Sequence, residues 1–245
     1  MPILEGKGVS RYFGGLAALL NVDFYVEKGE VLGLIGPNGA GKTTLFNVIS
    51  AAIPTMAGVI RFKGEEITGL KPHKICRMGI ARTFQTIKIF PNLPVINNVL
   101  LGSFFGASKD ISSEEALRQA SENLDFVGLS SVKEIPAKDL TLANQKRLEV
   151  ARALATDPEV ILLDEIMEGL NPTEVEQAME LVKRILARGV TVIMIEHVMR
   201  AIMNVCDRIL VLHHGQKIAD GTPSEIANSE TVIKVYLGDK VHAGT

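Results

Sequence analysis

The sequence predicts an α/β protein with a mostly parallel central sheet and a helical insertion. Short apolar runs bounded by Gly or Asp alternate with stretches of helical periodicity, which is typical of parallel strands covered by helices. Between Pro91 and Thr156 only the helical patterns remain. The 245 residues, 47% of them hydrophobic, can bury a large core. We expect a single domain with a core lobe at 1–87 and 157–245 and an inserted helical lobe at 88–156.

Four short apolar runs are expected to be buried strands of the core. The first of them leads directly into a glycine-rich loop and a helix at 42–50, and the last turns at His214-Gly215 into a hairpin partner around 217–219. The third is rich in β-branched residues, which favour strands. The four runs are 31–35, 160–163, 190–195 and 208–212.

Signals at their ends predict three further helices. Ser112 begins a capping box, and the helix that follows is closed by Gly128. A second helix covers about 144–155, because Asp157-Pro158 stops it. A third begins after Asn171 as cap and Pro172 at its first position.

Composition and charge exclude several classes of protein. The net charge of -2 and pI of about 6.2 argue against a broad basic surface, so no nucleic-acid partner is expected. The two cysteines, Cys76 and Cys206, lack metal-ligand spacing and are too few for a disulfide scaffold. The start of the chain lacks the pattern of a signal peptide, and no apolar run approaches the roughly 20 residues that span a bilayer. We therefore expect any work at a membrane to depend on partners.

Residues 36–44 read Gly-Pro-Asn-Gly-Ala-Gly-Lys-Thr-Thr and form a complete GxxxxGK[ST] phosphate-binding loop. The glycines let backbone N–H groups wrap a phosphate without side chains in the way. Lys42 then reaches the β- and γ-oxygens of ATP, and the Thr43 hydroxyl ligates Mg²⁺. The residues expected to hold the nucleotide are Asn38, Gly39, Ala40, Gly41, Lys42, Thr43 and Thr44.

Four other side chains are candidates for the same chemistry. Asp164 and Glu165 end a buried strand, where open α/β sheets bind ligands, so Asp164 can meet the metal while Glu165 polarises the attacking water. His197 follows another strand and could bond the γ-phosphate, and Gln85 could place an amide near the metal and the water. Taken singly, each has a plainer reading as a solvated strand end, a core histidine or a surface amide. Phe13 could stack on adenine, with core packing as its plainer reading.

The resemblance to ABC transporter ATPases covers essentially the whole chain. The motifs that resemble the full series of that family are, in chain order, Phe13, the loop 36–44, Gln85, 140–145, Asp164-Glu165, 168–171 and His197. Within that superfamily, Thr83-Phe84-Gln85, the run 87–91 and the ending Tyr236-Leu237-Gly238 are similar to ATP-binding subunits of branched-chain amino acid importers. The resemblance implies an ATPase that uses ATP and Mg²⁺ to drive uptake of branched-chain amino acids. It implies metal contacts from Thr43, Gln85 and Asp164, and catalytic roles for Glu165, His197, Gln85 and Lys42.

Two ATPase subunits of this family close head to tail, so that each ATP touches the phosphate loop of one and an LSGGQ-type signature of the other. In this chain the signature reads Leu-Thr-Leu-Ala-Asn, where importers of this kind usually show a sequence like LSYGQ. Asn144 is expected to cap the next helix, and Thr141 keeps a hydroxyl. Ala143 replaces a glycine, and its Cβ either blocks the phosphate or costs about 1–2 kcal/mol if φ is positive. We therefore expect a slow site at this signature and a heterodimer with a second ABC ATPase.

The resemblance also implies partners in a membrane. The segment at Gln85 marks the groove that receives a coupling helix of a permease subunit, and the apolar stretches 87–90 and 95–101 are the expected docking surface. A solute-binding protein would act indirectly, and the chain would lie on the cytoplasmic face of the inner membrane. Three alternatives stay open: an ATPase of urea import or lipopolysaccharide export, a weakly hydrolysing ATP-binding switch, and a soluble ABC-type ATPase. The last is disfavoured because the chain has no tandem unit or long coiled coil.

Overall fold

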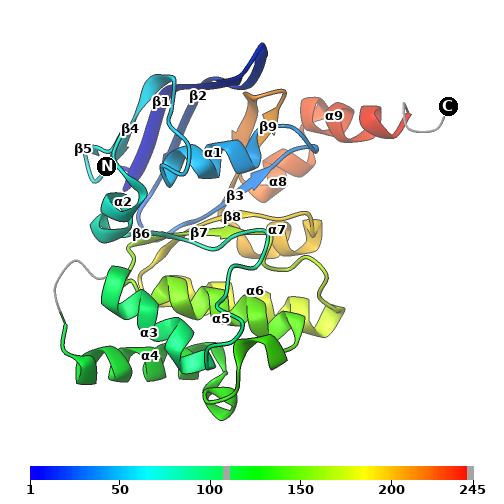
Figure 1. Cartoon of the computed structure of the whole chain (residues 1–245). Coiled ribbons are helices and arrows are strands. Elements are labelled where there is room, and N and C mark those ends of the chain that lie inside the picture. The colour runs from blue at the N-terminus through cyan, green and yellow to red at the C-terminus, as the bar shows by residue number, and fades with distance from the viewer. Residues whose placement is uncertain (107–110, 242–245) are drawn as a thin grey trace. The chain divides into compact units, whose positions relative to one another are not determined.

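The computed structural model describes residues 1–106 and 111–241, with side chains to 236, and divides into two compact units (Figure 1). The first unit contains Met1–Lys71 and the chain from Thr191 onward, and the second is Pro72–Val190. The predicted α/β class is confirmed, with parallel strands and an antiparallel N-terminal sheet. The units do not share the bounds of the expected lobes, because two strands and a long helix group with the helical segment. The lobe bounds stay a prediction.

The first unit holds an antiparallel sheet in the order β2-β1-β4-β5 and a second sheet in which β10, β9, β3 and β8 are neighbours. Its strands are β1 Leu4–Phe13, β2 Leu16–Val26, β3 Val31–Ile35, β4 Ala57–Phe62, β5 Glu65–Glu66, β8 Thr191–Ile195, β9 Arg208–His213 and β10 Gln216–Gly221. Its helices are α1 Lys42–Ile49, α7 Met199–Val205, α8 Pro223–Ala227 and α9 Glu230–Val241.

The predicted strands of this unit are confirmed. β3 has the expected bounds, is buried along its whole length and pairs in parallel with both β8 and β9. β9 turns back into β10 through His214 and Gly215, so the expected hairpin is also present. Because these pairs are parallel, the carboxyl ends of β3, β8 and β9 lie at the same edge of the sheet, where the glycine-rich loop follows β3.

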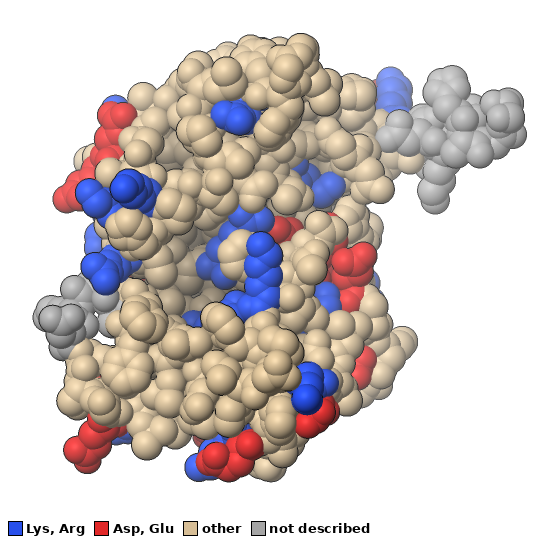
Figure 2. Space-filling model, viewed as in Figure 1, with Lys and Arg blue, Asp and Glu red and all other residues tan. Residues whose placement is uncertain are grey.

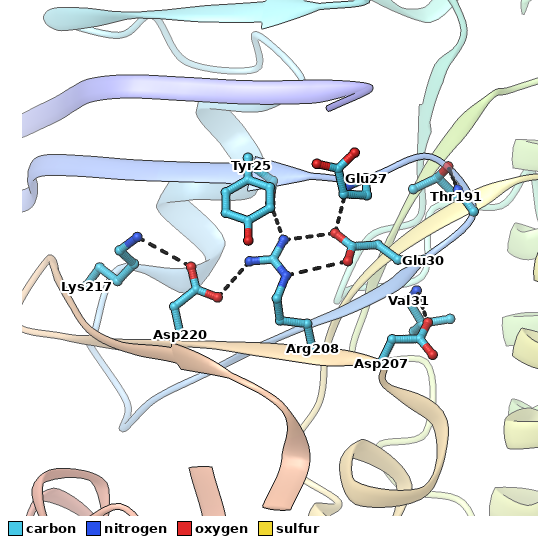
Figure 3. A network of polar contacts seen from close by, with 10 residues as sticks. Tyr25, Glu27, Glu30, Val31, Thr191, Asp207, Arg208, Lys217 and Asp220 are labelled. Carbon is cyan, nitrogen blue, oxygen red and sulfur yellow. Dashed lines mark hydrogen bonds and ion pairs between the residues drawn. The ribbon is translucent and has the colours of Figure 1, made fainter. Parts of the chain in front are cut away.

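A half-buried ion-pair network ties the two sheets of the first unit together (Figure 3). The guanidinium of Arg208 on β9 binds Glu30 Oε1 at 2.8 Å and Asp220 Oδ1 at 2.6 Å. It also donates to the Tyr25 carbonyl on β2 at 2.6 Å and lies 4.0 Å from the centroid of the Tyr25 ring. Burial alone lowers the pKa of Arg208, but its bonds to Glu30 and Asp220 raise it above the ordinary value.

The second unit is mainly helical, with one parallel strand pair. Its elements are α2 Pro72–Met78, β6 Ile80–Arg82, α3 Val95–Gly106, α4 Ser113–Val127, η1 Ser130–Val132, η2 Ala137–Asp139, α5 Leu142–Leu154, β7 Val160–Asp164 and α6 Pro172–Ala187. In α4 the Ser112 side chain accepts from the Glu115 N–H and Gly128 closes the helix at φ 79°, as predicted. The predicted capping box is only half formed, because the Glu115 carboxylate accepts from Arg118 and Gln119 instead. The predicted start signals also hold for α6, where Asn171 forms a complete capping box.

The expected cap of α5 is wrong. The helix begins at Leu142 rather than at Asn144, and the Thr141 side chain accepts from the Asn144 N–H at 3.3 Å. Thr141 has the extended backbone of a cap residue, so its hydroxyl takes the place predicted for the Asn144 amide.

On the face drawn in Figure 2, uncharged side chains cover most of the described surface, and Asp and Glu lie mainly at the margins. Among the helices of the described residues, none has both the length and the apolar character needed to cross a membrane.

Candidate functional site

The phosphate loop of the first unit requires glycine where backbone segments come close together. A Cβ on Gly36, which has φ +152°, would lie 2.1 Å from the Leu212 carbonyl oxygen. One on Gly41, at φ +104°, would lie 2.4 Å from the Ala18 carbonyl oxygen. Any larger residue at either place would displace neighbouring backbone, so these glycines fix the loop against β2 and β9.

The start of α1 fits an anion. Gly41 occupies the N-cap position and makes no side-chain cap bond, and the first turn of this described helix holds no acidic residue. The backbone N–H groups of the first turn and the positive dipole end of α1 therefore face the loop, and this is the arrangement that binds phosphate. The buried Lys42 lays its ammonium across the loop, where Nζ donates to the carbonyls of Gly36 at 2.8 Å and Pro37 at 3.1 Å.

Two contacts from later parts of the chain support this loop. The Gly215 N–H, at the β9–β10 turn, donates to the Ala40 carbonyl at 3.0 Å. Burial raises the pKa of Tyr236 on α9, while a hydrogen bond with the Gly36 backbone lowers it in part. Sequence reasoning noted Tyr236 only as part of a resemblance, since nothing in the sequence shows that the last helix reaches the phosphate loop.

Two other predicted site residues of this unit, Phe13 and His197, are exposed, so neither is a residue of the core. Phe13 at the end of β1 is 48% exposed, and the Arg11 guanidinium lies 5.0 Å from its ring centroid. His197 follows β8 and is exposed as well. Asn38, Gly39 and Thr43 are also exposed, whereas Thr44 is half-buried and Ala40 is buried.

In the second unit the short segment 82–85 binds both predicted carboxylates, Asp164 and Glu165. The Arg82 Nη2 atom binds Asp164 Oδ2 at 2.8 Å, and both side chains are almost fully buried. The next residue, Thr83, accepts the Asp164 N–H at 3.0 Å. Gln85 Nε2 donates to Glu165 Oε2 at 2.8 Å, so the predicted neighbourhood of Gln85 and Glu165 is present. Sequence reasoning missed Arg82, although the parallel pairing of β6 with β7 brings it beside the end of β7.

Glu165 has an unusual backbone. Its φ of 52° lies in the left-handed region, which costs a residue with a side chain about 1–2 kcal/mol. It is buried, and its carbonyl oxygen accepts from Lys146 Nζ at 2.6 Å. Sequence reasoning did not find Lys146, because a lysine that binds a backbone carbonyl has no sequence signature. Strained residues gather at functional sites, so this conformation adds to the case for Glu165.

The altered signature lies at the start of α5. Ala143 belongs to the helix and is not among the described residues with positive φ, so of the two expected effects of its Cβ the backbone strain does not arise. Its methyl group is buried within the second unit, beside a small cavity that Lys146, Ile166 and Leu170 also line. Leu142 is 45% exposed, and Thr141 is exposed too. The surface of this segment is therefore formed by its other residues rather than by the Ala143 methyl.

The expected docking surface is partly wrong. Within 95–101, Val95, Asn98 and Val99 are fully buried in α3, because this helix packs on α4 and α5. Asn98 Oδ1 accepts the Phe90 N–H at 2.7 Å, and Asn98 Nδ2 donates to the Phe90 carbonyl at 3.1 Å. Phe90 itself is 49% exposed on this fixed backbone and remains a candidate for docking.

Comparisons with known proteins agree with the motifs. A family model described as ABC transporter matches residues 19–168, and one described as Branched-chain amino acid ATP-binding cassette transporter matches residues 216–242. The chain is 39% identical to the high-affinity branched-chain amino acid transport ATP-binding protein BraF of Pseudomonas aeruginosa, over 97% of this chain and 98% of that protein. It is 38% identical to the protein LivG of Escherichia coli K12, which has the same description, with the same coverage.

Solved structures show the same fold. The crystal structure of the ADP conformation of MJ1267, an ATP-binding cassette of an ABC transporter, matches with a TM-score of 0.88 and 32% identity. The match covers 97% of this chain and 99% of that one. A dimeric structure of the ATP-binding cassette MJ0796, in a post-hydrolysis state bound to ADP and Pi, matches with a TM-score of 0.81 and 26% identity over 90% of this chain and 98% of that one.

Proposed function

The chain belongs to the ABC transporter family, and from this we propose that it is the ATP-binding subunit of an importer that hydrolyses ATP to take up branched-chain amino acids. The single observation that carries the ATPase part is the hydrogen bond from Gln85 to the buried Glu165, in a chain with an intact phosphate loop. The match of residues 216–242 to a branched-chain amino acid cassette favours this solute over urea or lipopolysaccharide.

The phosphate loop would hold the nucleotide, with the start of α1 and Lys42 binding its phosphates and the exposed ring of Phe13 stacking on adenine. The absence of an acidic residue from the first turn of α1 supports this fit. The Thr43 hydroxyl, Asp164 and Gln85 are the residues that would hold Mg²⁺, which would offset the charge of the phosphates. Arg82 keeps the Asp164 carboxylate in place through the 2.8 Å ion pair.

Hydrolysis depends on Glu165 as the base that takes a proton from the attacking water. Its bond to Gln85 orients the carboxylate, and His197 bonds the γ-phosphate. Lys42 stabilises the charge that develops on the transferred group. Each of these roles is positioning or electrostatic stabilisation, and these two effects supply most of the rate of phosphoryl transfer.

The partners are a second ABC ATPase subunit and membrane-spanning permease subunits, with a solute-binding protein acting indirectly. The dimeric structure of the similar cassette MJ0796 supports pairing of cassettes. The exposed Phe90, near Gln85 in the sequence, supports a permease contact on this side of the second unit. The chain would lie on the cytoplasmic face of the inner membrane, bound through these subunits.

Binding and turnover of ATP test the proposal. With Mg²⁺ and the partner subunits, Glu165→Gln should keep ATP affinity within about threefold and reduce turnover by at least 100-fold. Lys42→Ala should lose affinity instead. Uptake of labelled leucine by the reconstituted complex, with labelled urea as the control solute, tests the substrate. Binding without any wild-type turnover would favour the ATP-binding switch over the ATPase.

The heterodimer with a slow site at this signature needs a separate test. Because the Ala143 methyl is buried in its own unit, Ala143→Gly alone is a weak probe. The triple variant Thr141→Ser, Ala143→Gly, Asn144→Gln restores the usual residues and should raise turnover of the assembled complex about tenfold, the value of one recovered charge-assisted hydrogen bond. Unchanged turnover would show that this signature does not limit the rate.

A further inference from the structure

We propose that Lys146 is a positioning residue that holds Glu165 in its left-handed backbone conformation and thereby links the signature helix to the catalytic base of the same chain. The inference rests on the proposed role of Glu165 as that base. It concerns a residue outside the phosphate loop, the paired carboxylates and the signature itself.

The first step is the contact. Lys146 lies on α5, five residues after the Thr141 cap, and its Nζ atom donates to the Glu165 carbonyl oxygen at 2.6 Å. Lys146 is 8% exposed, and the cavity beside it is lined by Ile166 and Leu170. Such partly apolar surroundings strengthen the hydrogen bond that a charged donor makes, and they also make it costly to leave the desolvated ammonium without an acceptor.

The second step is the conformation that this contact stabilises. A residue with a side chain leaves the left-handed region unless its surroundings hold it there. Glu165 has φ 52°, and its own backbone carbonyl oxygen accepts the hydrogen bond from Lys146. Gln85 binds the other end of Glu165, at carboxylate Oε2. The base is therefore fixed at its backbone by α5 and at its side chain by the segment that follows β6.

The third step is the link to the signature. Thr141, at the proposed signature, caps the same helix that carries Lys146 little more than one turn later. A displacement of the start of α5 would therefore move the Lys146 ammonium relative to the Glu165 carbonyl. Contact of this signature with a nucleotide on a second subunit would then affect the base that serves this chain's own nucleotide.

Lys146→Met tests the inference, because it keeps an unbranched side chain of similar length and removes the donor. In the full-length chain without nucleotide, amide exchange over residues 164–170 should become at least fivefold faster, while exchange in β3 and α1 stays the same. In the assembled complex kcat should fall about 10- to 100-fold, the range for one charge-assisted hydrogen bond, with KM within about twofold. Lys146→Arg keeps a donor and should restore most of both properties.

Lys183→Met is the matched control, since it makes the same substitution at an exposed lysine on α6 of the same unit. It should behave as wild type in both measurements. Wild-type exchange and kcat in Lys146→Met would overturn the inference, as would equal losses in Lys146→Arg and Lys146→Met. If Lys146→Met fails to fold, Lys146→Gln replaces it with the same criteria. Absence of turnover in the wild-type complex would instead refute the proposed function, and the exchange measurement would still decide the role of Lys146.

Discussion

Removing the guanidinium of Arg208 should destabilise the first unit more than removing any exposed charge. The change Arg208→Met deletes the ion pairs with Glu30 and Asp220 and the bond to the Tyr25 carbonyl, and leaves a side chain of similar apolar length (Figure 3). These partners come from β2, from the residue before β3 and from β10. The network therefore joins both sheets of this unit.

The magnitude follows from burial. The side chains of Arg208, Glu30 and Asp220 are 13%, 14% and 17% exposed, so the variant leaves two poorly hydrated carboxylates without their cation. Breaking a buried pair in this way costs about 3–5 kcal/mol. Residual hydration and the nearby Lys217 place the loss at the low end, near 3 kcal/mol. For a chain of this length that corresponds to a fall in Tm of roughly 6–12 °C.

The assay is urea and thermal unfolding followed by circular dichroism at neutral pH. Lys217→Met is the matched control, because Lys217 binds the same Asp220 at 3.4 Å from an exposed position and should contribute at most about 0.5 kcal/mol. A loss below about 1 kcal/mol for Arg208→Met, or an equal loss for Lys217→Met, would refute the argument that burial makes this network important.

Three further predictions follow from single groups. Burial raises the pKa of Glu149, although the Lys88 N–H at 2.7 Å opposes this, so folding favours the protonated form. This contribution is present below the unfolded pKa of about 4.3 and is lost as pH rises through the higher folded value, and urea midpoints of Glu149→Gln should therefore gain on wild type between pH 4 and pH 7. Burial, with the charges of Asp207 and Glu196, raises the pKa of Cys206 to about 12, so iodoacetamide at pH 8 should modify Cys206 only after unfolding, as mass spectrometry can show. Thr141→Ala removes the α5 cap and should cost about 1 kcal/mol in thermal unfolding, whereas Thr141→Ser should cost almost nothing.

The sequence predicted the elements whose signals are local. The bounds of β3 follow from its apolar run, and the start of α6 follows from Asn171 and Pro172. The sequence predicts Asn144 rather than Thr141 as the cap of α5, because both residue types are good caps and only the position of the helix start decides between them. The surface stretch 95–101 was also misplaced, since an apolar helix shows its buried face only once its neighbours are known.

For the site, the sequence identified the residues that carry the chemistry but not those that hold them in place. Lys42 and Glu165 stand in motifs, so their types and spacing were enough to find them. Arg82 and Lys146 act on these motifs through tertiary contacts, one with a carboxylate and one with a backbone carbonyl. A backbone carbonyl is the same at every residue, so no pattern of side chains marks it as a partner. Only a structure reveals residues of this second kind, and Lys146 is the one through which we propose that a change at the signature reaches the base.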